Sequence, residues 1–374
     1  MDRRGFLSRL TQGLIVSAGG LKARDAEADA AGYRFLSACL GHGDGSEKNF
    51  EAAMLDQHGR VILQTTLAMR AHEMALHPSG SSYLAVGRQP GRLSTMVDLA
   101  DGRRLYDLAL HDDYEFNGHA VFLGQGAELV ATEEHVETSL GRLSFYDSAD
   151  GRWLRSWSSG GIEPHEALVD QARGRLIVAN GGILQRQAVG DVESSLVVLD
   201  LADGKPVLKA VLPEDLASLS MRHLALTAAG EVAFAMQDQD PQSDLRPLVG
   251  LMDLGGKLRF LDIPRDIAMT LRGYVGSVAV DGSSQVVCAT SPKGNIAMFW
   301  DLASGRWLGS IDVADGCGVA PTGQPGGFVL TGGKGDILLA MTLGRSGKPM
   351  APRATLLARD PRRQWDNHLT LLAA

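Results

Sequence analysis

The chain of 374 residues is 44% hydrophobic and 6% aromatic, which is enough apolar material for a sizeable core. Its formal net charge is −8 and it has no basic cluster, so there is no electrostatic basis for binding nucleic acid. Three widely spaced cysteines exclude a disulfide framework and a Cys-x-x-Cys metal site. The 45 glycines predict many tight turns rather than long helices.

Residues 1–30 are predicted to be a cleaved export signal that precedes a single domain over residues 31–374. Paired arginines at positions 3 and 4 precede Phe6, Leu7 and a short, weakly apolar run, and small residues follow. This start resembles a twin-arginine signal and predicts a periplasmic protein. The alternative is a disordered, basic N-terminus. The apolar run is too short and too rich in glycine to span a bilayer, so no membrane span is expected.

A short motif of the form Asp-Leu-Ala-Asp-Gly recurs between apolar strands. It occurs in "VDLADGRRLYDLAL" (97–110), "YDSADGRWLRSW" (146–157), "LDLADGKPVLKAVL" (199–212) and "WDLASGRWLGSIDV" (300–313). In each copy an apolar strand ends at Asp, Gly follows, and another strand begins, as in a β-hairpin whose Gly has a positive φ. Including two degenerate copies, we assign these aspartates to turn chemistry: Asp56, Asp98, Asp147, Asp200, Asp253 and Asp301.

A second pattern, a histidine just ahead of an apolar run, recurs in register with the first. Together they define a unit of about 45 residues, the period of β-propeller blades. The predicted units are 72–110, 118–157, 165–212, 222–263, 275–313 and 317–360. A further unit near the N-terminus lacks its innermost strand, which "DNHLTLLAA" (366–374) supplies. We therefore predict an all-β, seven-bladed propeller in which the C-terminal strand, at about 366–372, completes the N-terminal blade and closes the ring.

The strand–Asp-x-x-x-Gly–strand pattern resembles the YVTN-type β-propellers over nearly all of residues 31–374. The paired-arginine start, the length and the closing "QWDNHL" are similar to domain-of-unknown-function family 1513, which comprises exported bacterial proteins. This resemblance implies a connection with iron acquisition and, as partners, periplasmic iron-uptake proteins of the imelysin and di-haem types. It implies no catalytic residues, because the match is specific to fold.

The repeat places histidine just before the innermost strand in five of the seven blades. Counting the N-terminal blade as blade one, the successive ring positions are His368, His72, His119, His165, His223, Gly276 and Gly318. Because the chain reaches every innermost strand from the same side, we expect these positions to circle one mouth of a central channel. Side chains alternate along a strand, which leaves open whether the imidazoles face the channel or a neighbouring blade.

The connections between the second and third strands reach the same face of the propeller. Those at 41–49, 133–141, 181–194 and 237–247 are long, and long loops on a rigid scaffold often carry binding residues. Further charged residues expected near the channel, besides Glu73, Glu166 and Arg222, are Arg70, Glu163, Arg272 and Asp366. We therefore predict that the functional face is the one that carries the ring.

Two binding or structural interpretations fit the ring. The histidines could be structural, each imidazole satisfying buried groups of a neighbouring blade, with the face left to a protein partner. They could instead hold iron, copper or haem, for which imidazole is a suitable ligand. Three adjacent members, such as His72, His119 and His165 with Glu73 or Glu166, could converge on one ion. Five ligands spread around a channel could not.

A third interpretation is catalytic. "MRHLALTAAGEVAFA" resembles a segment of propeller lactonases, and in that hydrolase His223 and Arg222 would act with Glu166. An oxidoreductase at the same face is a further alternative. The leading prediction is a monomeric binding or scaffold protein in iron or metal handling rather than an enzyme.

Overall fold

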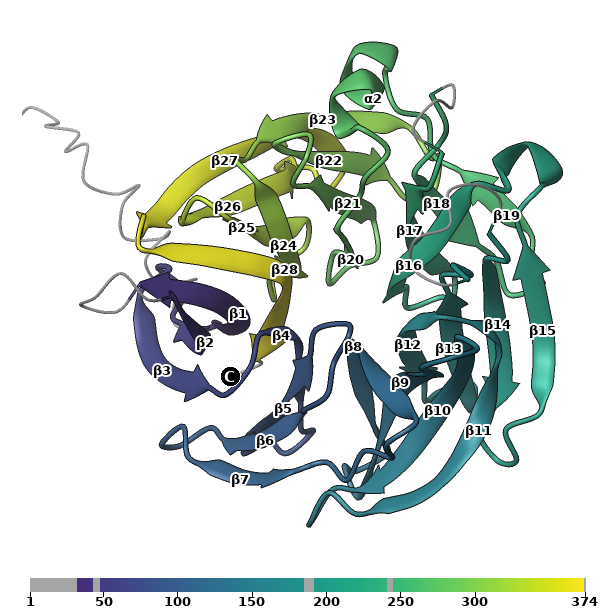
Figure 1. Ribbon diagram of the computed structural model, residues 1–374. Helices are drawn as coiled ribbons and strands as arrows, with labels where there is room; N and C mark the ends of the chain where they lie inside the picture. The colour runs from purple at the N-terminus through teal and green to yellow at the C-terminus, as the bar shows by residue number, and fades with distance from the viewer. Residues whose placement is uncertain (1–31, 43–47, 185–191, 241–244, 373–374) are drawn as a thin grey trace, which may run out of the picture. The chain divides into compact units, whose positions relative to one another are not determined.

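Alternating apolar residues and tight turns build seven four-stranded antiparallel sheets in the computed structural model, which describes residues 32–42, 48–184, 192–240 and 245–372. Figure 1 shows the sheets as the blades of a ring. In each blade one edge strand lies nearest the centre of the ring, here called the hub, and the opposite edge strand lies at the rim. The predicted seven-bladed propeller is confirmed. The predicted export signal lies outside the described residues and stays a prediction.

The innermost strands of blades one to seven are β28 (Arg363–Leu372), β4 (Ala71–Leu76), β8 (Tyr114–Leu123), β12 (Pro164–Asp170), β16 (Leu219–Leu226), β20 (Ser277–Val280) and β24 (Gly316–Pro321). The second strands are β1 (Arg34–His42), β5 (Ser82–Gly87), β9 (Glu128–His135), β13 (Arg175–Asn180), β17 (Val232–Asp238), β21 (Val286–Ser291) and β25 (Gly327–Gly332).

The third strands are β2 (Lys48–Leu55), β6 (Thr95–Asp98), β10 (Leu140–Asp147), β14 (Ser195–Asp200), β18 (Val249–Met252), β22 (Ile296–Asp301) and β26 (Asp336–Leu343). The outermost strands are β3 (Val61–Leu67), β7 (Arg104–Asp107), β11 (Trp153–Ile162), β15 (Pro206–Val211), β19 (Leu258–Phe260), β23 (Trp307–Asp312) and β27 (Pro349–Arg359). Within the described residues, two short helices, η2 (Glu214–Leu216) and α2 (Arg265–Leu271), lie in connections.

The Asp–Gly turns form as predicted. Between β6 and β7, Asp98 Oδ1 accepts a hydrogen bond from the backbone N–H of Ala100 at 2.8 Å, and Gly102 has a φ of +74°. A β-carbon is strained in that backbone region, so the turn favours glycine. Asp147 and Asp200 accept the equivalent backbone hydrogen bond at 3.0 and 2.9 Å. The recurring aspartates therefore belong to the hairpins.

Pairing between β28 and β1 closes the ring as predicted. The two strands run antiparallel, with Phe35 opposite Leu371. Phe35 and Trp365 are buried in one apolar cluster with Ile337 of blade seven, so both ends of the chain share a core with their neighbour. Burying a side chain of this size is worth roughly 1.5–3 kcal/mol. Closure removes two exposed sheet edges.

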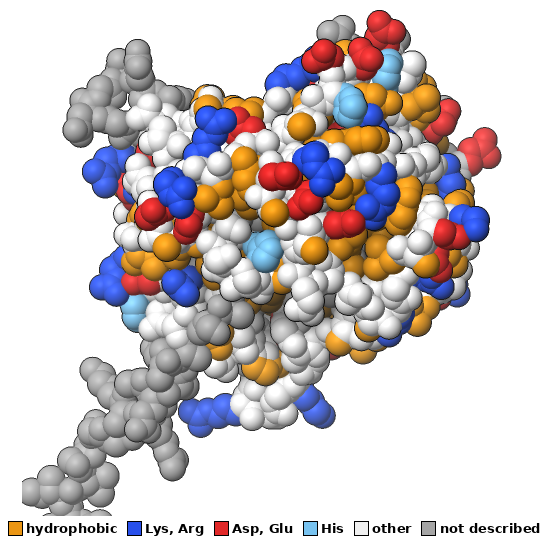
Figure 2. Space-filling view, turned by 90° about the horizontal axis from the view of Figure 1, so that it is seen from below, with side chains coloured by type: hydrophobic (Ala, Val, Ile, Leu, Met, Phe, Trp, Pro, Cys, Tyr) orange, Lys and Arg blue, Asp and Glu red, His pale blue; other side chains and the backbone are white. Residues whose placement is uncertain are grey.

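Apolar side chains pack between neighbouring blades and fix the innermost strands. Phe145 of β10, for example, is fully buried against Leu176 and Val178 of β13. Alternate residues of the outermost strand β3 are exposed, and Figure 2 shows charged side chains of both signs interspersed with apolar ones on the side drawn there. The innermost strands, which carry the ring positions, are mostly buried, as β4 and β12 show, whereas the outermost strand β3 is exposed on alternate residues.

One predicted loop is wrong. The segment 133–141 was expected to be a long connection, but β9 continues to His135 and the connection covers only residues 136–139. Glu133 is fully buried in β9, where Tyr146 Oη donates to it at 2.6 Å and Arg142 Nε at 2.8 Å. Consecutive glutamates indicate a solvated loop, but here a buried charge is paired. The centres of the other three long connections lie outside the described residues.

Candidate metal centre

The ring histidines form one compact cluster at the hub, here called the histidine cluster: His72, His119, His165, His223 and His368. In nine of the ten pairs of these rings the centroids lie between 4.6 Å apart, as for His72 and His368, and 6.1 Å apart, as for His72 and His223. The imidazoles therefore face one another at the hub, which answers the question left open by the sequence. His119 is fully buried and His223 is 1% exposed.

Irregular strand pairing directs these side chains to the hub. In β4 the register shifts between Ala71 and Glu73, on either side of His72, and in β12 it shifts between Pro164 and Glu166, on either side of His165. Register shifts also occur at or beside the ring position in β8, β16 and β28. A β-bulge turns a side chain out of the normal alternation. The innermost strands thus present their histidines to one another.

Three histidines contact a carboxylate of the preceding blade through Nδ1. His119 Nδ1 lies 3.1 Å from Glu73 Oε2, and His223 Nδ1 lies 3.3 Å from Glu166 Oε2. His72 Nδ1 lies 3.6 Å from Asp366 Oδ1, which is an ion-pair distance and not a hydrogen bond. A carboxylate accepts, so it favours the tautomer with hydrogen on Nδ1 and a lone pair on Nε2. This is the arrangement that orients metal-binding histidines.

His165 differs from these three histidines because its Nδ1 faces a hydrogen-bond donor instead of a carboxylate. Arg222 Nη1 lies 3.2 Å from His165 Nδ1, and Arg222 Nη2 donates to Glu163 Oε1 at 3.0 Å. A guanidinium has only donors, so His165 Nδ1 accepts and the neutral ring carries its hydrogen on Nε2. In this tautomer His165 presents an N–H group, not a lone pair, on its Nε2 side.

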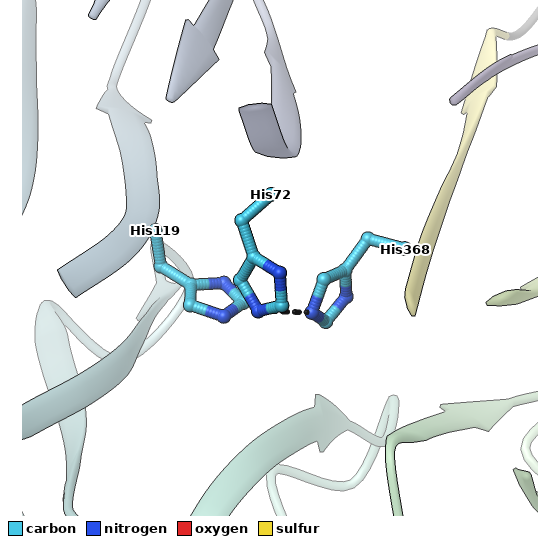
Figure 3. Close-up of side chains that lie close together, drawn as sticks. All are labelled: His72, His119 and His368. Atoms are coloured by element: carbon cyan, nitrogen blue, oxygen red, sulfur yellow. Dashed lines mark hydrogen bonds between the residues drawn. The ribbon is translucent and has the colours of Figure 1, made fainter. Parts of the chain in front are cut away.

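His72, His119 and His368 form one of the groups that could hold a metal ion. The Nε2 atoms of His72 and His368 are 3.2 Å apart, and two imidazole ligands on one tetrahedral ion at 2.0–2.1 Å would lie about 3.3 Å apart. The buried Nε2 of His119 has no hydrogen-bond partner among the described residues. One ligand atom from each residue lies within 4.8 Å of the others, and Figure 3 shows the three rings side by side, with His72 between His119 and His368.

Two further ligand groups of this kind share members with the first: His72, His165 and His223, and His119, Glu166 and His223. The predicted helpers Glu73 and Glu166 therefore lie in the cluster, as does His223. Arg222, which the catalytic alternative paired with Glu166, binds Glu163 and His165 instead. Asp366 also lies at the hub, whereas Arg272 is exposed at the end of α2.

Burial and neighbouring charges set the protonation of the cluster. Burial lowers the pKa of His72 to about 4, and it lowers the pKa of His165, His223 and His368 well below the usual value. Burial also opposes charge on His119, but the Glu73 and Glu166 carboxylates outweigh it and raise the pKa of His119. Burial raises the pKa of Glu166 to about 8. Neutral imidazoles are the metal-binding form, and the same carboxylates that stabilise a proton on His119 would stabilise a metal cation in its place.

A polar cavity of about 190 Å³ adjoins the histidine cluster. Three of the histidines line it together with residues that sequence reasoning did not single out: Arg88, Gln89, Asn117, Gln237, Tyr274 and Asn367. Asn117 lies two residues before its ring position, as Asp366, Arg70 and Glu163 do. A polar residue two positions before the ring position therefore recurs, and this pattern could have identified Asn117 from the sequence.

The remaining titratable candidate near the hub is Cys317, next to Gly318. It is buried, and burial raises the pKa of its thiol well above the usual value. Cys39 and Cys288 are buried as well, and none of the three is in a disulfide. A buried thiol of this kind is inert, so the chemistry of the hub belongs to the imidazoles and carboxylates.

Comparison with known proteins supports the fold and identifies the family. Hydrazine synthase from Kuenenia stuttgartiensis superposes with a TM-score of 0.60 at 13% identity over 86% of this chain and 95% of that chain. The U3-55K structure superposes with a TM-score of 0.56 at 11% identity over 78% and 84% of the two chains. At these identities the likeness concerns the fold alone.

No curated protein matches the chain. Among the described residues, no helix is long and apolar enough to cross a membrane. One family model matches residues 65–372, and the resemblance inferred from the sequence is confirmed: the chain belongs to the family described as "Protein of unknown function (DUF1513)".

Proposed function

We propose that the histidine cluster binds a transition-metal ion, with His72, His119 and His368 as its imidazole ligands. The observation that carries the proposal is the set of Nε2 atoms at the hub. Those of His72 and His368 lie 3.2 Å apart, and that of His119 is buried with no hydrogen-bond partner among the described residues. A metal ion would satisfy all three atoms at once.

The surroundings support the same proposal. Glu73 and Asp366 contact Nδ1 of His119 and His72, which leaves the Nε2 lone pairs for the ion. His223, held through Nδ1 by Glu166, lies beside the three proposed ligands. Imidazole suits iron, copper and zinc, and carboxylates next to it favour iron. The rings of the cluster already lie in contact, so an ion fits this space and a haem macrocycle does not.

A purely structural cluster explains only half of these contacts. The Nδ1 contacts with Glu73, Glu166 and Asp366 do link neighbouring blades. However, such a role leaves the buried Nε2 of His119 unsatisfied, which costs about 1–3 kcal/mol. We therefore assign the Nδ1 atoms to positioning and the Nε2 atoms to the ion.

We further propose that the protein binds or transfers this metal in the periplasm, with iron-uptake proteins as partners. This part rests on the paired arginines at positions 3 and 4 and on what membership of the family implies. The second candidate function is a hydrolase, for which the contact between His223 Nδ1 and Glu166 Oε2 is the supporting observation. Arg222, its third member, donates to Glu163 and contacts His165 instead.

Metal analysis of protein purified without chelator tests the proposal. Wild-type protein should contain, or take up on reconstitution, about one equivalent of iron, copper or zinc. The variant His119→Ala should lose the ion, and His58→Ala, which changes an exposed histidine in a turn, should retain it. Less than about a tenth of an equivalent after reconstitution would contradict the metal centre. Hydrolysis of lactones or esters that persists without metal, and disappears in His223→Ala and in Glu166→Gln, would favour the hydrolase.

A further inference from the structure

The polar cavity beside the histidine cluster is enclosed by residues of several blades. His72, one of the proposed ligands, lines it together with His165 and His223, and Arg222 and Asn117 are among its other polar lining residues. Its volume of about 190 Å³ corresponds to roughly six water molecules at about 30 Å³ each. The cavity thus has room for a small polar molecule next to the ion.

Two hydrogen-bond donors lining the cavity are not used by the protein. Arg222 is 8% exposed, and its Nε has no partner among the described residues, although both of its terminal nitrogens are engaged. His165 Nε2 is likewise buried without a partner in the described part of the chain. Because His165 Nδ1 faces the Arg222 guanidinium, Nε2 carries the hydrogen. A ligand that offers two acceptor oxygens would satisfy both donors.

Asn117 adds one unused acceptor to the same cavity. It is fully buried, and its Nδ2 donates to the backbone carbonyl of Pro164 at 3.0 Å, which fixes the orientation of the amide. Its Oδ1 has no partner within the residues that the structure describes. This atom would accept a hydrogen bond from a hydroxyl group of the ligand. Two donors, one acceptor and an adjacent cation match an oxyanion that also carries a hydroxyl group.

Building on the proposed metal centre, we propose that the cavity binds a small hydroxylated oxyanion, either bicarbonate or a short hydroxycarboxylate, at an open position of the ion. The oxygens of its carboxylate group accept from His165 Nε2 and Arg222 Nε, and its hydroxyl group donates to Asn117 Oδ1. His165 is then a positioning residue for the ligand rather than a metal ligand. The centre resembles catalytic metal sites, which keep one position open, more than closed structural sites.

Anion titration of the cobalt(II)-loaded protein, followed by visible absorption, tests this inference. Bicarbonate, glycolate and acetate should each shift the cobalt bands saturably, and sodium chloride at equal ionic strength should not. In Asn117→Ala, bicarbonate and glycolate should bind at least about tenfold more weakly, whereas acetate, which has no hydroxyl group, should bind as before. His165→Phe should keep the full cobalt content and lose affinity for all three anions. His58→Ala should behave as wild type.

The outcomes separate the two proposals. Absence of cobalt uptake by the wild-type protein overturns the metal centre and this inference with it. Full uptake with no spectral response to any of the anions overturns this inference alone. Loss of cobalt in His165→Phe, with an unchanged circular dichroism spectrum, would make His165 a ligand and overturn its assignment as a donor. Equal weakening of acetate and glycolate in Asn117→Ala would overturn the hydroxyl contact.

Discussion

Blades one to five carry histidine at the hub, whereas blades six and seven carry glycine at the same position. All seven nevertheless form four-stranded sheets of the same topology. At Gly318 a β-carbon would lie 2.7 Å from Thr331 Oγ1 and 3.1 Å from the Leu369 β-carbon, so no side chain fits. At Gly276 it would lie 3.1 Å from Pro292 Cδ. A blade of this propeller therefore does not need the histidine, although the histidine recurs with the blade.

Hydrogen bonds from a second strand to the innermost strand of the next blade occur both in the histidine blades and in the glycine blades. In the histidine region, the Thr132 hydroxyl of β9 donates to the backbone carbonyl of His165 at 3.1 Å. In the glycine region, the Thr290 hydroxyl of β21 donates to the carbonyl of Cys317. Hydroxyl groups of second strands thus link neighbouring blades whether or not a histidine is present. The imidazoles are additional to this frame, which favours a role in binding.

The largest loss of metal affinity is expected when the histidine of one blade is replaced by glycine, the residue at the same position in blades six and seven. His72→Gly removes a proposed ligand that lies 3.2 Å from His368, and metal affinity should fall by more than about 100-fold, beyond the loss typical of outer-shell changes. Equilibrium dialysis measures the affinity, and cooperative unfolding by urea checks the fold. His58→Gly is the control. Unchanged affinity in the His72 variant would show that the cluster does not hold the ion.

A smaller effect is expected from the carboxylates that only the histidine blades use. Glu73→Gln keeps the size of the side chain but removes the charge that contacts His119 Nδ1 at 3.1 Å. Metal affinity should fall by roughly 10–100-fold, the range for outer-shell partners. Equilibrium dialysis against the exposed control Glu137→Gln measures it. Equal affinities in the two variants would mean that Glu73 does not act through His119.

Adding a side chain at the glycine position of blade seven should lower stability and leave metal binding unchanged. Gly318→Ala puts a methyl group against Thr331 Oγ1, and such overpacking should lower the free energy of unfolding by about 1–2 kcal/mol. Gly344→Ala, whose β-carbon would meet nothing closer than 3.4 Å, is the matched control. Urea denaturation measures both. If Gly318→Ala left the free energy of unfolding unchanged, lack of space would not explain why blade seven has no histidine.

The fold was predictable because its signals are local and repeated. The hydrogen bond of Asp98 and the positive φ of Gly102 lie within one turn, and the same chemistry recurs about once a blade. Register alone then placed His368 beside β1, and the structure confirms that pairing. Equivalent positions of equivalent blades necessarily meet at the hub, so the members of the histidine cluster could be predicted as well.

The geometry of the site could not be predicted, because it depends on irregularities and distant contacts. The register shift around His72 in β4 leaves no composition signal, yet a one-residue shift decides which way a side chain faces. Arg88 and Asp366, 2.7 Å apart, are separated by 278 residues. The tautomer of His165 depends on Arg222 of the next blade. These contacts determine how the histidines of the cluster are oriented and which residues line the cavity beside it.

The smallest effect is expected from the frame that both regions share. Thr132→Val preserves the shape of the side chain but removes the hydroxyl group that donates to the carbonyls of His119 and His165. Thr132 is fully buried, so the loss should lower the free energy of unfolding by about 1 kcal/mol without changing the amount of metal bound. Thr290→Val in the glycine region should cost about the same, since its hydroxyl makes the equivalent link. Urea denaturation and metal analysis of both variants check this. If Thr132→Val released the metal and Thr290→Val did not, the frame of the histidine region would itself be part of the metal centre, and the separation of frame from site drawn above would fail.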